Sequence, residues 1–153
     1  MIRRTTSAVC SAAVALLSFG CASAPETIMN GVDPFGWDEA TVVEYDNRDT
    51  VSLRDLALTI RYGAALKDNR LPLTITTMAP DSTCISEQKV FFLECRPGPA
   101  ATAAVENIVY RRSARLSQQG TYSVTIEPHV PLKGVEAVGI TFEKAEQTWE
   151  KTN

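Results

Sequence analysis

The sequence has little of the chemistry on which catalytic and metal sites depend. Its 153 residues include one histidine, His129, and no Gly-x-Ser-x-Gly motif accompanies it. A lone histidine excludes most histidine-based zinc sites and any proton relay between two imidazoles. We therefore expect a protein that is not an enzyme, with no catalytic residues, no cofactor, no bound metal and no small-molecule ligand.

Dense positive charge is also missing. Lys and Arg number 15 against 18 Asp and Glu, which gives a net charge of −3. Removal of an N-terminal segment that contains Arg3 and Arg4 leaves 13 basic residues and a net charge of −5. Because a nucleic-acid-binding surface needs clustered cations to neutralise phosphates, this acidity excludes nucleic acid as a partner.

The sequence has no apolar run of the length that a membrane-spanning helix needs. The apolar stretch from Ala8 to Phe19 has only about a dozen residues, whereas a helix that crosses the hydrocarbon core needs about 20. A short cationic start with Arg3 and Arg4 precedes this stretch, which is the layout of a secretory signal. Residues 1–20 are therefore predicted to be a cleaved signal peptide.

The end of the apolar stretch, residues 17–21 (Leu-Ser-Phe-Gly-Cys), resembles the lipobox of bacterial lipoproteins. In such lipoproteins, signal peptidase II cuts before the cysteine and the thiol is acylated. The resemblance predicts lipidation of Cys21, although Ser18 stands where a lipobox usually has Leu. The alternative is an ordinary signal peptide that is cut after Ala22 or Ala24.

A lipid on Cys21 would hold the protein at a membrane surface, because two or more acyl chains give stable anchoring. Residues 21–36 are small, polar and interrupted by Pro and Gly, as in a flexible tether. Ala22 rather than Asp follows the cysteine, which favours the outer membrane. We expect an outer-membrane lipoprotein that faces the periplasm and contacts the membrane through this anchor.

Two further cysteines, Cys84 and Cys95, are separated by ten residues. In an oxidising envelope such a pair most often forms a structural disulfide, and closing a loop of this size contributes about 3 kcal/mol. The spacing differs from the Cys-x-x-Cys motif of redox enzymes. We predict a Cys84–Cys95 disulfide, with two free thiols as the alternative.

From residue 37 to residue 144 the apolar residues recur with the period of two that is typical of β-strands. Leu56, Leu58 and Ile60, for example, alternate with Ala57 and Thr59. Such stretches cover residues 41–45, 56–62, 71–76, 88–94, 105–111, 121–126 and 135–143. They predict one all-β domain at 37–144, an antiparallel β-sandwich or jelly roll of about seven to eight strands, followed by a polar tail at 145–153.

Two of these stretches carry a further expectation. Pro72 has no N–H to donate, so its strand should start there or lie at a sheet edge, where a partner strand could add. Residues 88–94 are apolar at both parities, which is typical of a strand covered on both faces.

Several polar residues leave two interpretations open. Arg111, Arg112 and Arg115 form a short basic cluster, which is either a solvated strand end or a site for an anion or a partner. The acidic residues between Asp33 and Asp49 are either solvated turns or calcium ligands, although the Asp-x-Asp-x-Asp-Gly loop is missing.

Residues 49–51 (Asp-Thr-Val) and 81–83 (Asp-Ser-Thr) lie in predicted turns and resemble the short acceptor pattern for O-glycosylation in Bacteroidota. Aromatic residues could stack on sugars if several lined one exposed face, and otherwise they belong to the core. The aromatic candidates are Trp37, Tyr45, Tyr62, Tyr122 and Trp149.

The chain also resembles a known family. Residues 120–126 (Gly-Thr-Tyr-Ser-Val-Thr-Ile) and 131–140 (Pro-Leu-Lys-Gly-Val-Glu-Ala-Val-Gly-Ile) are similar to the closing block of the gliding motility lipoprotein GldH family of Bacteroidota. Trp37 and residues 56–61 (Leu-Ala-Leu-Thr-Ile-Arg) look like its early strands. The chain departs from the family at residues 129–131, His-Val-Pro, where Met-Arg is usual, and the cysteine pair is not a family feature.

The resemblance implies a non-catalytic lipoprotein that acts as a structural or protein-interaction component at the outer membrane, associated with gliding and with protein secretion. Its expected partners are other envelope proteins. Gly120 and Gly139 would relieve a turn or a close packing contact, and Tyr122 would lie in the core with its hydroxyl at an edge. A glycan-binding β-sandwich lipoprotein is the alternative function.

Overall fold

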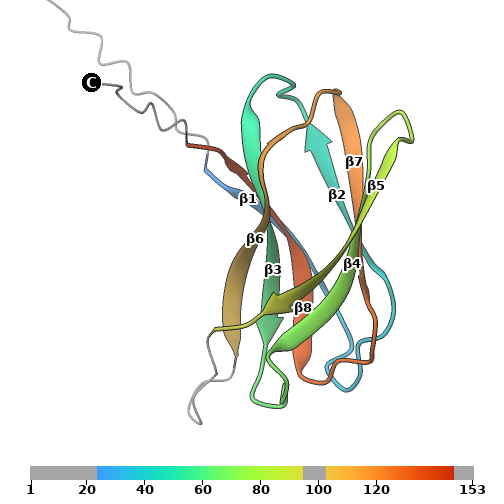
Figure 1. The fold of residues 1–153 in the computed structure, drawn as a ribbon, viewed down its shortest axis with the longest axis vertical. Coiled ribbons are helices and arrows are strands. Elements are labelled where there is room, and N and C mark those ends of the chain that lie inside the picture. Colours follow the sequence, from blue (N-terminus) through green and yellow to red (C-terminus); the bar gives the residue numbers. More distant parts are fainter. Residues whose placement is uncertain (1–23, 95–102, 147–153) are drawn as a thin grey trace, which may run out of the picture.

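The computed structural model describes residues 24–94 and 103–146, which form eight antiparallel strands and no helix (Figure 1). None of these residues therefore contributes a helix that could cross a membrane. The strands are β1 (Glu26–Gly31), β2 (Thr41–Asn47), β3 (Leu53–Tyr62), β4 (Arg70–Met78), β5 (Cys84–Phe92), β6 (Ala104–Arg115), β7 (Gly120–Pro128) and β8 (Val135–Lys144).

The strands form two four-stranded sheets, with the orders β1-β8-β3-β6 and β2-β7-β4-β5. Four of the ladders join β1 to β8, β2 to β7, β3 to β6 and β4 to β5. This nested pairing is that of a long antiparallel hairpin rolled into two layers, which is a jelly roll. The predicted all-β sandwich is confirmed.

The core lies between the two sheets and is made by the alternating residues that the sequence pattern indicated. Leu58 and Ile60 on β3, and Ile140 on β8, are completely buried. Full burial of each such side chain stabilises the fold by about 1.5–3 kcal/mol. Tyr45 of one sheet stacks on Phe142 of the other, with the ring centroids 4.0 Å apart. These contacts hold the two sheets together as one domain.

The first strand corrects the expectation of a flexible tether over residues 21–36. Residues Glu26–Gly31 pair with β8 along their whole length, from Glu26 opposite Phe142 to Gly31 opposite Ala137. The pairing needs a close backbone approach at Gly139, where a Cβ atom would lie only 1.9 Å from the carbonyl oxygen of Ile28. Gly139 therefore relieves a packing contact, as expected, and the contact it permits is the one that makes β1 a strand.

The strand that contains Pro72 does not lie at a sheet edge and does not start at the proline. It begins at Arg70 and lies between β7 and β5. The Pro72 carbonyl accepts a hydrogen bond from the His129 N–H at 3.0 Å, just beyond the end of β7. Because the N–H and C=O of a strand residue point to the same side, the N–H that Pro72 lacks would have faced the end of this ladder, where its loss costs little.

The expectation that residues 88–94 form a strand covered on both faces is also corrected. The observed strand β5 begins four residues earlier, at Cys84, and is an edge strand. Phe91 is buried in the core, whereas Val90 and Phe92 on the other face are 43% and 56% exposed. The apolar character of both parities therefore reflects a core face and an exposed apolar face.

The strand β5 covers most of the segment that the predicted Cys84–Cys95 disulfide would close. Cys84 begins β5 and has a free, exposed thiol. Cys95 lies outside the described residues, but Glu94, to which it is bonded, follows the other end of the same strand. Nine strand residues extend over roughly 26 Å, whereas a disulfide requires Cα atoms within about 7 Å of each other. The intervening residues form an extended strand and not the loop that the prediction assumed.

The remaining predictions for the chain ends concern residues outside the described ranges. The signal peptide at 1–20, the lipidated Cys21 and Trp149 all lie there. At the C-terminal side, β8 ends at Lys144, one residue beyond the predicted strand at 135–143, and Ala145 of the expected tail still donates a hydrogen bond to the Leu53 carbonyl.

Strand direction divides the loops between two ends of the sandwich. The terminal end holds the start of β1, the end of β8 and the loops 48–52, 79–83 and 116–119 (upper part of Figure 1). The far end holds the loops 32–40, 63–69 and 129–134 (lower part of Figure 1). Each candidate site can be assigned to one of these ends.

Candidate functional site

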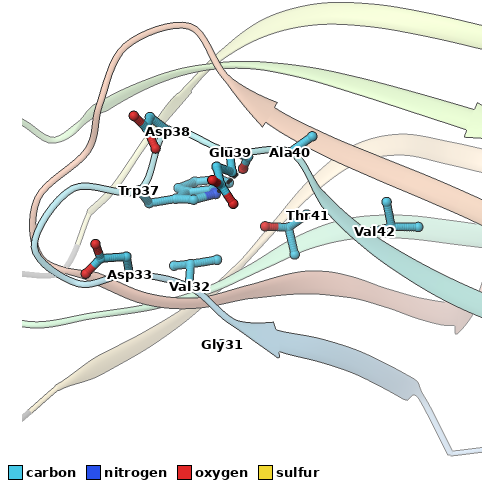
Figure 2. Close-up of a pocket in the computed structure, with 9 residues that line it drawn as sticks. All are labelled: Gly31, Val32, Asp33, Trp37, Asp38, Glu39, Ala40, Thr41 and Val42. Carbon is cyan, nitrogen blue, oxygen red and sulfur yellow. Dashed lines mark hydrogen bonds between the residues drawn. The ribbon is translucent and has the colours of Figure 1, made fainter.

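The far end carries a pocket of about 610 Å³ beside the loop that joins β1 to β2 (Figure 2). Trp37 is its central residue and is only 2% exposed. The indole N–H donates a hydrogen bond of 2.7 Å to the carbonyl of Glu39, which holds the loop in a tight turn over the ring. The pocket is lined by Gly31, Val32, Asp33, Trp37, Asp38, Glu39, Ala40, Thr41 and Val42.

Three of the residues that line this pocket are carboxylates and none is a cation. Figure 2 shows Asp33 on one side of Trp37, with Asp38 and Glu39 on the other. The Asp33 carboxylate accepts the Phe35 N–H at 2.9 Å and so fixes the tip of the loop. We call this site the acidic pocket.

A second pocket, of about 480 Å³, lies on the other side of the same loop cluster and has the opposite charge. Its lining includes the cations Lys67, Arg70 and Lys133 and one carboxylate, Asp68. The apolar part of the lining comes from Leu66, Pro72, Val90, Val130, Pro131 and Leu132. We call this site the basic pocket.

A short β-bridge joins the walls of the two pockets. The Trp37 N–H donates to the Leu132 carbonyl at 3.0 Å, and the Leu132 N–H donates to the Trp37 carbonyl at 2.9 Å. Gly134, in the left-handed region at φ 88°, donates to the Pro34 carbonyl nearby. The acidic and basic pockets are therefore held at a fixed separation from each other.

Large apolar side chains are exposed around both pockets. Phe35 is 83% exposed at the tip of the 32–40 loop, and Val130, which lines the basic pocket, is 49% exposed. On β5, Val90 lines the basic pocket, and Phe92 follows it toward the far end. Exposed apolar groups that lie beside charged residues are typical of a surface that binds another protein.

His129 lies on the exposed surface just beyond the end of β7. Its Nε2 atom shares a hydrogen bond of 2.7 Å with the hydroxyl of Thr74. A catalytic triad would need a carboxylate on the other ring nitrogen. No hydrogen bond or ion pair in the described part of the chain joins a carboxylate to His129.

The aromatic residues that would have formed a sugar-binding platform are in the core. Trp37, Tyr45, Tyr62 and Tyr122 are between 2% and 5% exposed. The Tyr122 hydroxyl accepts the Gln118 N–H at 3.1 Å, which confirms a core ring with its hydroxyl at an edge. These four residues therefore do not form the exposed aromatic face that would have favoured a glycan-binding module.

The acidic residues that are close in sequence are divided between the two ends. Asp33, Asp38 and Glu39 lie at the far end, whereas Asp46 and Asp49 lie at the terminal end. Within residues 24–94 and 103–146, no three carboxylate, thiol or imidazole side chains are grouped so that they could hold a metal ion.

The two sequences that resemble glycosylation acceptors are turns at the terminal end. Ser82 and Thr83 are exposed, and Ser82 has a left-handed backbone at φ 68°. Thr50 is half-buried. The Asp49 carboxylate accepts the N–H groups of Val51 and Ser52, and these bonds, together with one from the Ser52 side chain, hold the pKa of Asp49 far below its usual range.

The sequence analysis missed most of the far-end residues. Phe35 stands between Pro34 and Gly36, which reads as a turn, and a single apolar residue in a turn has no periodicity to mark it. Lys67 lies in the 63–69 loop and Arg70 begins β4, whereas Lys133 lies in the 129–134 loop, which is distant in sequence. The one available signal was the second apolar parity of residues 90–92, which places Val90 and Phe92 on the outer face.

Comparison with known proteins gives a distant structural likeness. No protein-family model matches the chain, and no curated protein matches it in sequence. The fold is similar to that of a chain in the structure of the infectious bursal disease virus Gx strain, with 10% sequence identity and a TM-score of 0.39. The match covers 83% of the present chain and 38% of the viral chain, so the chain spans well under half the length of that neighbour.

Proposed function

We propose that this chain is a non-catalytic lipoprotein of the cell envelope, anchored through Cys21 to the outer membrane on its periplasmic side, and that its far end binds other envelope proteins. The function of the gliding motility lipoprotein GldH family, which the sequence resembles, is of this kind. The observation that carries the proposal is the position of β1, which starts at the end of the sandwich opposite the two pockets.

The short reach from Cys21 to the sandwich determines which end can face the membrane. Glu26, the first residue of β1, follows Cys21 by five residues. Five peptide units span at most roughly 18 Å. A lipid on Cys21 would therefore keep the terminal end beside the membrane, and the far end would point away from it toward soluble or membrane-bound partners.

The far end has the mixed chemistry that protein recognition uses. Exposed Phe35 and Phe92 are the largest apolar side chains available to a partner, and buried aromatic side chains commonly contribute most of the binding energy. The acidic and basic pockets lie on either side of the Trp37–Leu132 bridge. Such separated charges select a partner with the opposite arrangement and fix its orientation.

Two measurements test the two parts of this proposal. For the anchor, membranes that contain the wild-type chain or Cys21→Ser are washed with carbonate. The wild type should stay with the membrane and Cys21→Ser should be released. Retention of Cys21→Ser would overturn the anchor.

For the partner surface, the wild type is crosslinked in intact cells and compared with the double variant Phe35→Ser, Phe92→Ser. A matched control is Val51→Ser, which changes a 75% exposed apolar residue at the terminal end. Adducts with envelope proteins should be lost in the double variant and kept in the control. Equal adducts in all three chains would exclude the far end as the binding surface.

A further inference from the structure

A third pocket, of about 460 Å³, opens at the terminal end between the edge strands β5 and β6. Its floor is apolar, because Leu56, Leu116 and Tyr122 reach it from the core. These three side chains are only 2–6% exposed, so the apolar surface that a ligand can reach comes from Ile85, which is 48% exposed, and from the half-buried Ala79 and Ala114. Its volume is within the range of sites that bind small organic ligands.

The pocket is kept open by an irregular region of β6. The β3–β6 register shifts twice between Arg54 and Ala57, so that β6 carries extra residues at this point. Ser113 adopts the left-handed region at φ 51°, and its N–H donates to the Asp55 carboxylate at 2.8 Å. Bulges and strained non-glycine residues of this kind are frequent beside functional sites, where they redirect side chains.

The redirected side chains are the arginines that the sequence analysis left unassigned. Arg111, Arg112 and Arg115 line the pocket, and its lining contains no carboxylate. Arg111 pairs with Glu87 at 2.8 Å and Arg112 with Asp55 at 3.5 Å. Among the described residues Arg115 has no such ion pair, so its guanidinium is available to an added anion.

We propose that this pocket binds a long-chain fatty acid, with the carboxylate at Arg115 and the acyl chain along Ile85, Ala79 and Ala114, above the buried Leu56, Leu116 and Tyr122. A guanidinium binds a carboxylate through two parallel hydrogen bonds, and an apolar floor removes a hydrocarbon chain from water. Neither the acidic pocket, which has no cation, nor the pocket beside Arg48, which has a carboxylate-rich lining, offers this combination. The inference does not depend on acylation of Cys21.

The test measures binding of cis-parinaric acid, a fluorescent fatty acid, to the full-length chain with Cys21→Ser, so that no lipid of its own can occupy the pocket. Arg115→Gln is compared with Arg48→Gln, an 84% exposed arginine at the same end whose side chain does not line the pocket. Thermal unfolding checks that both variants fold. Loss of a charge-assisted hydrogen bond should raise the Kd about tenfold or more in Arg115→Gln, and Arg48→Gln should bind as the parent does.

Three results would overturn the proposal. The parent chain fails to bind the probe, all variants bind it equally, or Arg70→Gln loses binding while Arg115→Gln does not, which would place the ligand in the basic pocket. A fourth arm uses vesicles of phosphatidylglycerol. Binding to these vesicles without binding to the monomeric fatty acid would assign the arginines to the membrane surface and also contradict the proposal.

Discussion

The two ends of the sandwich are closed in different ways. At the terminal end the three loops have four or five residues each, and side chains of Asn47, Asp49 and Asp81 bond to their backbone groups. At the far end the loops 32–40, 63–69 and 129–134 are longer, and backbone bonds such as those between Trp37 and Leu132 hold them. Short loops capped by side chains leave few apolar groups exposed, whereas the longer loops leave room for two pockets and for Phe35. The comparison indicates that the far end is the surface for a protein partner, whereas the tightly closed terminal end carries the pocket proposed for a fatty acid.

The largest loss of stability is expected from a substitution that separates β1 from β8. Gly139→Val would place side-chain atoms on the backbone of Ile28, where even a Cβ lies 1.9 Å from the carbonyl oxygen. We expect a loss of about 3 kcal/mol in the free energy of unfolding in urea, as for an overpacked core. Gly36→Ala at the far end, where nothing lies within 4 Å of the added Cβ, is the control. It should stay within about 0.5 kcal/mol of the wild type. Equal stability of the two variants would show that β1 is not tightly paired.

A smaller loss is expected from Asn47→Ala, which removes the amide that ties two terminal loops together. This fully buried side chain donates to the carbonyls of Leu116 and Gln118, both at 2.8 Å. The two carbonyls would lose their partner inside the fold, at a cost of about 2 kcal/mol in urea unfolding. Asn30→Ala, which removes an exposed bond to the Val42 carbonyl, is the control and should cost much less. A neutral Asn47→Ala would mean that water replaces the amide.

The carboxylates of the terminal loops should make stability depend on acid pH. Hydrogen bonds from backbone N–H groups and neighbouring side chains lower the pKa of both Asp49 and Asp81. A lowered pKa in the folded state means that the stabilisation is present above the unfolded pKa, near 3.8, and is lost as the pH falls further. The double variant Asp49→Asn, Asp81→Asn should therefore lose less stability on acidification than the wild type. Urea midpoints of unfolding at neutral pH and below pH 4 would show this difference. An equal fall of the midpoint in both proteins on acidification would contradict the prediction.

The smallest stability effect is expected at the far end. Phe35→Ser with Phe92→Ser should change the free energy of unfolding by no more than about 0.5 kcal/mol, because both rings are largely exposed. The same variant is expected to lose its crosslinks to envelope proteins. A large loss of stability would instead show that these rings pack against the fold, and the contrast between the two ends would then be wrong.

Seven of the eight strands could be predicted from the alternation of apolar residues, since the two faces of these strands differ in burial. Leu56, Leu58 and Ile60, for example, share one parity of the predicted strand at 56–62, and all three are buried. The strand β1 was missed because it contributes only one half-buried core residue of this kind, Ile28, and is held mainly by backbone bonds to β8. Backbone pairing leaves no mark in a sequence when the side chains are small or polar.

The candidate sites were predictable only in part. The Arg111–Arg115 cluster stood out because its members are neighbours in sequence, but the apolar floor beneath it comes from Leu56, Leu116 and Tyr122 on separate elements. The basic pocket joins Lys67 and Lys133, which are brought together only by the rolled topology. The predicted loop between Cys84 and Cys95 is a strand for the same reason, since the spacing of two cysteines contains no information about the direction of the chain between them.

The pairing of β1 with β8 has a consequence for the order in which the protein can mature. Glu26, near the start of the described chain, pairs with Phe142 of β8, near its end. Contacts between such distant residues form late in folding, because a long loop must close first. In the lipoprotein proposed above, the segment next to Cys21 would therefore be unpaired during export and accessible to the processing and acylating enzymes. Only when β8 has crossed the inner membrane would β1 be drawn into the sheet and the distance between anchor and body be fixed.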